Sequence, residues 1–243
     1  MRGGSIHLFK LWGIDVSLHF SWFFIAVFQI TRPRGYASPM FAIYEYLALF
    51  GIVLMHEFGH ALACRQTGGQ ANFIMLWPLG GVAFVQPPQR PGAQLWSIAA
   101  GPLVNVALIP ILALAQFVAV ALGIPVNAPD TYRLLATISW INGGLLVFNL
   151  LPIYPLDGGQ ILRSLLWYPF GQIRSLQAAS AIGFIGCIAA GIYALWLQSF
   201  WIGILVFFLI SQAMAGWRHA QALALAAEEA KRAPAIPERP PML

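Results

Sequence analysis

Long apolar stretches separated by short polar segments dominate the hydropathy pattern of this chain. No Asp, Glu, Lys or Arg occurs in the 39 residues between Arg90 and Asp130, or in the 43 residues between Arg174 and Arg218. A helix needs about 20 predominantly apolar residues to cross a bilayer. The pattern therefore predicts an all-α polytopic membrane protein with about six transmembrane helices.

Prolines, glycines and charged residues divide this pattern into spans. The first four are expected at about 16–30, 40–63, 94–122 and 134–150. The 43-residue uncharged stretch would be about 65 Å long as a single helix, roughly twice the thickness of the membrane core. We therefore expect it to break near Gln198 and Ser199 and to form the fifth and sixth spans.

Residues 73–87 fit neither a span nor a polar loop, because they are apolar but interrupted by Pro78, Gly80 and Gly81. Apolar runs on both sides of a Pro/Gly turn are typical of a β-hairpin. We expect a short membrane-embedded β-hairpin between spans two and three, dipping in from the cytoplasmic side. Non-helical backbone at that depth must be shielded by protein or line a wet cavity.

Composition supports the membrane class and excludes several others. Hydrophobic residues make up 59% of the chain and charged residues 9%, against roughly 45–50% and 25% in soluble proteins. Low charge and long apolar runs argue against a disordered chain and a β-barrel. The net charge of +5 comes from basic residues scattered between spans, so the expected partner is the lipid bilayer and not nucleic acid. Cys64 and Cys187 are expected to be packed thiols.

The distribution of basic residues predicts the topology. Six spans place both termini on one side, and ten of the thirteen Lys and Arg residues fall on that side. By the positive-inside rule, both termini are cytoplasmic in a cell-membrane protein. Residues 1–217 are expected to form a single transmembrane core, and 218–243 a cytoplasmic tail that is first helical and then Pro-rich and disordered. The oligomeric state stays open.

The second span contains the chemistry-bearing sequence His56-Glu57-Phe58-Gly59-His60. Histidines at i and i+4 lie on one helix face and can bind one metal ion, while the intervening Glu can hold a water molecule and accept its proton. A carboxylate inside a span costs at least about 2.5–3.5 kcal/mol on insertion scales, which favours a functional role. The alternative is a Glu–His pair that only packs two helices.

A hydrolytic zinc site usually has three protein ligands, so one more donor is needed near the cytoplasmic end of another span. Asp157 fits, because span four descends to that side and is followed by a stiff turn that ends in Leu156-Asp157-Gly158-Gly159. Taken alone, this Asp-Gly pair could also be an ordinary turn. Zinc is favoured by the ligand types, although cobalt or iron could occupy the same ligands.

HEFGH on an early span, followed by NLLPIYPLDGG after a later one, resembles the site-2 protease family of intramembrane zinc metalloproteases. The resemblance covers about residues 13–161, and one departure is Tyr154, where many members carry Pro. The PDZ and CBS modules of many relatives are not expected in this compact form. Further similar segments are GIDVSLHFS at 13–21, WPLGGVA at 77–83 and GPLVN at 101–105.

The resemblance implies a zinc endopeptidase that cleaves transmembrane protein substrates in regulated intramembrane proteolysis. It implies that His56, His60 and Asp157 bind one zinc ion and that Glu57 is the general base. It also implies that Asn105 and Asn149 position substrate or stabilise the oxyanion. From the residues alone, both asparagines could equally join helices or cap turns.

Three other functions compete with the protease. A zinc transporter needs ligands connecting both membrane faces, but spans three, five and six carry no deep acidic or His residue. Other HExxH membrane proteases usually take a Glu as third ligand, and the later Glu residues all lie in the tail (Glu228, Glu229 and Glu238). A non-enzymatic zinc-binding scaffold would be expected to lack one of the four site residues.

Overall fold

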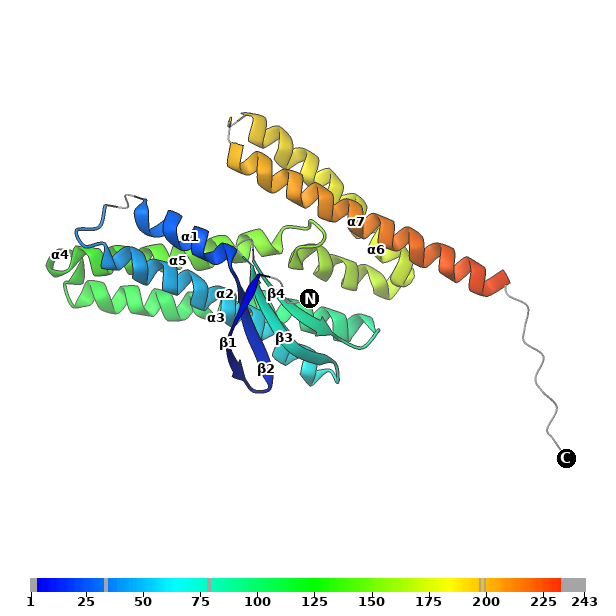
Figure 1. The fold of residues 1–243 in the computed structure, drawn as a ribbon, viewed down its shortest axis with the longest axis horizontal. Helices are drawn as coiled ribbons and strands as arrows, with labels where there is room; N and C mark the ends of the chain where they lie inside the picture. Colours follow the sequence, from blue (N-terminus) through cyan, green and yellow to red (C-terminus); the bar gives the residue numbers. More distant parts are fainter. Residues whose placement is uncertain (1–3, 33–34, 78–79, 197, 199, 233–243) are drawn as a thin grey trace.

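The computed structural model describes residues 4–32, 35–77, 80–196, 198 and 200–232. The described chain is mostly helical, with one four-stranded sheet (Figure 1). In chain order the elements are β1 (Ser5–Leu11), β2 (Ile14–His19), α1 (Ser21–Thr31), α2 (Met40–Gln66), β3 (Gln70–Trp77), β4 (Gly80–Gln86), α3 (Pro91–Ala121), α4 (Ile124–Asn127), α5 (Pro129–Leu150), α6 (Asp157–Trp196) and α7 (Phe200–Arg232).

Among the described residues, four helices are long and apolar enough to cross a membrane, namely α2, α3, α5 and α6. They correspond to predicted spans two to five, and they fit a multi-pass membrane protein. The first predicted span, at about 16–30, is not a single long helix in the structure. Helix α1 has only 11 residues, fewer than the roughly 20 that a crossing needs, because the residues before it form a strand.

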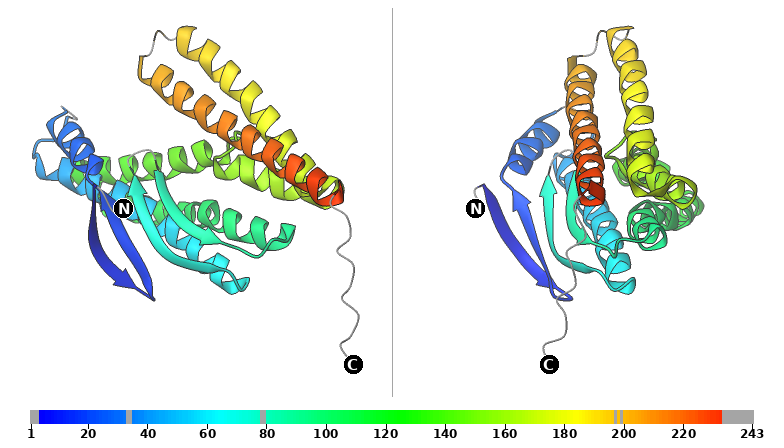
Figure 2. Two further views of the ribbon diagram at one scale, coloured as in Figure 1. Left: turned by 45° about the vertical axis from the view of Figure 1, so that its right-hand side comes forward. Right: turned by 90° about the vertical axis from the view of Figure 1, so that its right-hand side faces the viewer.

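The last two helices form an antiparallel pair that projects from the rest of the molecule (Figure 2). Helix α6 begins at Asp157, well before the predicted fifth span, and changes direction at Gly171, where φ is 77° and ψ is 172°. The predicted break falls between α6 and α7, although Ser199 itself lies outside the described residues. Helix α7 runs without interruption to Arg232, and the expected disordered segment 233–243 also lies outside the described residues.

The sheet corrects the all-α prediction, because it includes an N-terminal hairpin that the sequence reading missed. Strands lie in the order β1-β2-β3-β4, with β2 parallel to β3 and the other pairs antiparallel. Trp12 and Gly13 join β1 to β2 and both have positive φ, 49° and 75°, as in the two-residue turns of hairpins. Strands β3 and β4 form a hairpin between α2 and α3 in chain order, and its position within the membrane stays a prediction.

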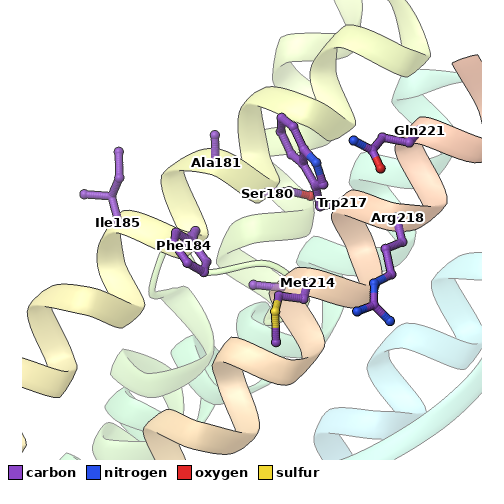
Figure 3. A pocket seen from close by; sticks show the side chains of 9 residues that line it. Ser180, Ala181, Phe184, Ile185, Met214, Trp217, Arg218 and Gln221 are labelled. Atoms are coloured by element: carbon purple, nitrogen blue, oxygen red, sulfur yellow. The ribbon is translucent and has the colours of Figure 1, made fainter.

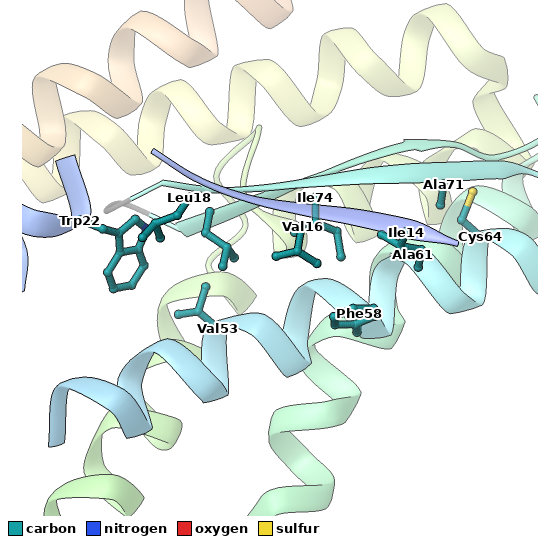
Figure 4. Close-up of a cluster of buried hydrophobic side chains, with 11 residues drawn as sticks. Ile14, Val16, Leu18, Trp22, Val53, Phe58, Ala61, Cys64, Ala71 and Ile74 are labelled. Atoms are coloured by element: carbon teal, nitrogen blue, oxygen red, sulfur yellow. The ribbon is translucent and has the colours of Figure 1, made fainter. Parts of the chain in front are cut away.

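The sheet packs on α2 through a buried apolar cluster (Figure 4). Every second residue of β2 points into this cluster and meets side chains from α2 such as Val53 and Phe58. Cys64 is buried in the same cluster and Cys187 in a second one, so both cysteines are packed thiols as predicted. The cluster fixes the sheet against the helix that carries the HEFGH motif.

A separate cavity of about 580 Å³ lies between α6 and α7 (Figure 3). Its walls are largely apolar, with Phe184 and Ile185 from α6 facing Met214 and Trp217 from α7. None of the residues singled out in the sequence for chemistry lines it. The cavity is therefore distinct from the site described next.

Candidate metal centre

The HEFGH motif lies on α2, and its three polar side chains are buried. His56, Glu57 and His60 are 3%, 5% and 5% exposed. The spacing of four residues places both imidazoles on the same face of the helix. One potential ligand atom from each of the three residues lies within 4.8 Å of the other two. The grouping expected from the sequence is therefore present in the structure.

Helix α3 approaches this face of α2 closely because glycine occupies the contact points. A Cβ atom at Gly59 of α2 would lie 2.7 Å from the Ala100 carbonyl oxygen of α3. A Cβ atom at Gly101 of α3 would lie 2.8 Å from His56 Nε2 and would also collide with the His60 ring. The glycine of the GPLVN segment thus leaves the volume that the two imidazoles fill.

Asp157 reaches the same point from the other side, as the first residue of α6. Its Oδ2 lies 3.0 Å from His56 Nε2 and 3.4 Å from His60 Nε2. The turn between α5 and α6 is so tight that a Cβ atom at Gly158 or Gly159 would collide with its backbone. Both glycines after Asp157 are therefore needed to bring its carboxylate to the two histidines.

The hydrogen bonds of the far ring nitrogens orient both imidazoles. His60 Nδ1 lies 2.9 Å from the Ser97 carbonyl oxygen, which can only accept, so Nδ1 carries the proton. His56 Nδ1 lies 2.6 Å from Asn105 Oδ1, an amide oxygen that also only accepts. In the neutral rings both Nε2 atoms therefore present lone pairs.

Three acceptors converge where these side chains meet. The two Nε2 atoms are 3.0 Å apart, and Asp157 Oδ2 lies 3.0 and 3.4 Å from them. Such a group repels itself unless a cation is shared. Ligand atoms about 2.0–2.1 Å from a tetrahedral zinc ion lie roughly 3.3 Å apart, so this set fits one zinc ion in both size and chemistry.

The two asparagines expected near the site occupy different positions. Asn149 Nδ2 lies 3.4 Å from His56 Nε2, next to the converging acceptors. Asn105 is fully buried, and its Nδ2 donates to Asn142 Oδ1 at 2.8 Å. The sequence reading did not single out Asn142, although an Asn seven residues before Asn149 lies on the same face of an apolar helix, which is a usable signal.

The close approach at Gly101 leads to a first prediction. Gly101→Ala should lower the affinity of the chain for zinc at least as much as the roughly 10–100-fold loss that changes around metal ligands cause. The added methyl group occupies the place of both imidazoles. Competition with a chromophoric chelator measures this affinity. Gly51→Ala on α2 is the control, because nothing lies within 4 Å of its Cβ position; equal affinities in the two variants would contradict the geometry.

Comparison with known proteins gives consistent matches. The family model for peptidase family M50 matches residues 44–124 and 114–193, together more than half of the chain. A zinc metalloprotease of Methanocaldococcus jannaschii is 36% identical over 180 residues, which cover 74% of this chain and 50% of that protein. A putative zinc metalloprotease of a Synechocystis species is 30% identical over 236 residues, 89% of this chain and 61% of that protein.

The solved structure of a site-2 protease from Methanocaldococcus jannaschii has the same fold. It superposes with a TM-score of 0.62 and 27% identity, covering 88% of this chain and 95% of that one. Against the two curated relatives above, however, the chain spans 50% and 61% of their length. The likeness therefore covers only part of those two proteins.

Proposed function

This chain belongs to the site-2 protease family, peptidase family M50, and from that premise we propose that it is an intramembrane zinc metalloprotease. Its reaction is hydrolysis of peptide bonds in or near the transmembrane segments of membrane proteins. The observation that carries the proposal is the convergence of His56 Nε2, His60 Nε2 and Asp157 Oδ2 within 3.4 Å of one another. These three groups would hold the metal.

When bound, zinc lowers the pKa of water and polarises the scissile carbonyl. The chain supplies the remaining functions. Glu57, beside the first ligand and buried with it, would orient the attacking water, accept its proton and return that proton to the leaving amine. Asn149, whose Nδ2 lies beside the ligand atoms, would donate a hydrogen bond to the oxyanion.

Two alternatives are less well supported. A zinc transporter needs a series of sites, and within the described ranges of the chain the potential metal ligands gather at one place, around His56 and His60. Glu57 is buried beside the histidines but is not among the three converging acceptors. A non-enzymatic zinc-binding scaffold would have no use for this additional buried carboxylate. The matched relatives are also described as metalloproteases.

The topology completes the proposal. We place six spans in the membrane by adding two segments to the four long helices, namely α7 and the stretch in which strand β2 leads into the short helix α1. This leaves both termini and the active-site end cytoplasmic. His56 precedes the end of α2 at Gln66 by a distance of roughly 15 Å at the helical rise. Water would therefore reach the site by a short path from the cytoplasmic face.

Direct cleavage of single-span proteins tests the function. Full-length chain in lipid nanodiscs is incubated with single-span reporters tagged at both ends, and fragments are measured by mass spectrometry. Cleavage within or beside the span, its loss on chelation and its return with added zinc are expected. Intact reporters in the presence of zinc-loaded protein, across a panel of spans that contain helix-breaking residues, would count against the proposal.

The edge of the sheet gives a further prediction about substrate binding. β4 is one of the two edge strands of the sheet, so one of its backbone edges can pair with a locally unwound substrate. Successive backbone N–H groups of a strand point to opposite edges of the strand. Of the two variants Phe84→Pro and Val85→Pro, one therefore loses an N–H that points away from the sheet, and the other loses an N–H that faces β3. The variant that loses the outward donor should melt like wild type and cleave about tenfold more slowly.

The comparison between these two neighbouring positions is its own control. The variant that loses a backbone hydrogen bond to β3 should melt at a lower temperature. The melting temperature therefore shows which variant this is, independently of the cleavage rate. If the variant with wild-type melting also cleaves at the wild-type rate, pairing of substrate with β4 is wrong. The zinc content of both variants should equal that of the unchanged chain.

A further inference from the structure

Asn142 of α5 is a buried polar residue that the proposed mechanism does not use. It is 1% exposed, and Asn105 of α3, its partner, is 0% exposed. Burying an amide is costly unless its donors and acceptors are paired. Neither side chain is open to a substrate, so their contacts with each other and with His56 must explain why they are there.

The hydrogen bonds of Asn142 have only one consistent direction. Its side chain faces the backbone carbonyl oxygen of Asn105 at 3.0 Å, and a carbonyl can only accept, so Asn142 must present its Nδ2 there. The other end of the amide, Oδ1, then faces the Asn105 side chain at 2.8 Å. An amide oxygen accepts, so Asn105 must present its own Nδ2 to Asn142.

The orientation of the Asn105 amide in turn determines the tautomer of His56, the candidate metal ligand. With Nδ2 committed to Asn142, Asn105 presents Oδ1 to His56 Nδ1 at 2.6 Å. His56 therefore carries its proton on Nδ1 and presents the Nε2 lone pair to His60 and Asp157. If the Asn105 amide turned over, its NH₂ group would face Nδ1 and favour the opposite tautomer, whose Nε2–H cannot bind a metal.

We propose that Asn142 is a positioning residue for the metal site: through Asn105, it fixes the tautomer of His56 that can bind zinc. The inference rests on the proposed function in identifying the ion, but the tautomer itself is a property of the metal-free chain. Asn105 accordingly acts behind the ligand and not on the substrate. His60 needs no such relay, because a backbone carbonyl, that of Ser97, already accepts from its Nδ1.

The test reads the tautomer and the zinc affinity separately. In full-length, metal-free chain in lipid with labelled histidine, ring carbon and nitrogen shifts report the tautomer of each of the five histidines, and a His56→Ala spectrum assigns the signal. Asn142→Leu should shift His56 towards the Nε2–H form. In a chelator competition, it should weaken zinc binding by roughly 10–100-fold, as loss of outer hydrogen bonds to metal ligands does.

Two further variants separate positioning from packing. Ser139→Ala, one turn earlier on α5, removes a similar α3–α5 hydrogen bond, which Gln116 donates at 2.5 Å, and should change neither readout. Asn105→Asp supplies an acceptor that cannot turn over. In the Asn105→Asp/Asn142→Leu double variant, the Nδ1–H tautomer should therefore return and zinc binding should recover relative to Asn142→Leu alone.

Each result decides the inference. An unchanged His56 tautomer in Asn142→Leu overturns it, and so does an equal loss of zinc affinity in Ser139→Ala. Should Asn142→Leu fail to fold, the double variant still decides, because a folded double variant with the Nε2–H form contradicts the relay. A wild-type chain that shows the Nδ1–H tautomer but binds no zinc would refute the proposed function, but it would not contradict the control of the His56 tautomer by Asn142 through Asn105.

Discussion

Glu57→Gln should abolish cleavage of a single-span reporter while leaving the zinc content of the protein unchanged. The amide keeps the size of the side chain but cannot accept a proton from water. General-base catalysis contributes about 10²–10⁴-fold to a rate, so the residual rate should fall to the background of the reporter assay. Glu57 is not one of the three converging acceptors, so metal content measured by mass spectrometry should equal that of wild type.

A matched control lies on the same helix. Glu45 of α2 is also buried, and its Oε2 accepts a hydrogen bond from the Tyr36 hydroxyl at 3.1 Å. Glu45→Gln makes the same chemical change away from the HEFGH motif and should retain cleavage. If Glu57→Gln cleaves at the rate of Glu45→Gln in equally zinc-loaded protein, Glu57 is not the base.

In cells, the same variant can identify substrates. Membrane proteomes of cells carrying wild type or Glu57→Gln should differ in a small number of single-span proteins. These would accumulate at full length, or after trimming by another protease, in the variant, and their cytosolic fragments would be lost.

The parts of this molecule that the sequence predicted depend on short-range periodicity. Histidines four residues apart share a helix face whatever the rest of the chain does, so the His56 and His60 pair followed from spacing alone. The long spans followed from uninterrupted apolar length. The β3–β4 hairpin followed from apolar runs on both sides of a Pro/Gly turn.

The N-terminal hairpin was missed although its signal is local. Ile14, Val16 and Leu18 alternate with Asp15, Ser17 and His19, a period of two that marks a strand with one apolar face. The apolar residues of α1 follow directly, so that strand and helix together resemble one long apolar span. A two-residue turn with glycine before an alternating segment is the stronger signal.

The contacts that complete the site could not be read from spacing. Asn105 and Asn142 are 37 positions apart, and His56 and Asp157 are 101 apart. Their meeting depends on how closely α2, α3, α5 and α6 approach one another. Gly59 and Gly101 allow the approach of α2 and α3, because they leave space that a Cβ atom would fill. Sequence alone marks such glycines but not the side chains that use their space.

Removal of the proposed third zinc ligand should have the second large effect. Asp157→Asn is expected to eliminate both tight zinc binding and cleavage, because a neutral amide replaces the one negative charge among the three converging acceptors. The loss of affinity should exceed the roughly 10–100-fold typical of changes behind a ligand. Zinc at about 1,000 times its Kd stabilises a folded protein by about 4 kcal/mol, so the rise in Tm that zinc gives the wild type should disappear in this variant.

Asp130 provides the matched control for this change. It is a half-buried carboxylate in the first turn of α5, and its Oδ2 accepts a hydrogen bond from the Ala37 backbone N–H at 2.8 Å. Asp130→Asn should retain zinc content, the zinc-dependent rise in Tm and cleavage. If Asp157→Asn kept the same zinc-dependent rise, a donor other than Asp157 would complete the site, and the fit of one zinc ion to the two histidines and this carboxylate would be wrong. Loss of zinc in Asp157→Asn with retention in Glu57→Gln would separate the residues that hold the metal from the residue that moves the proton.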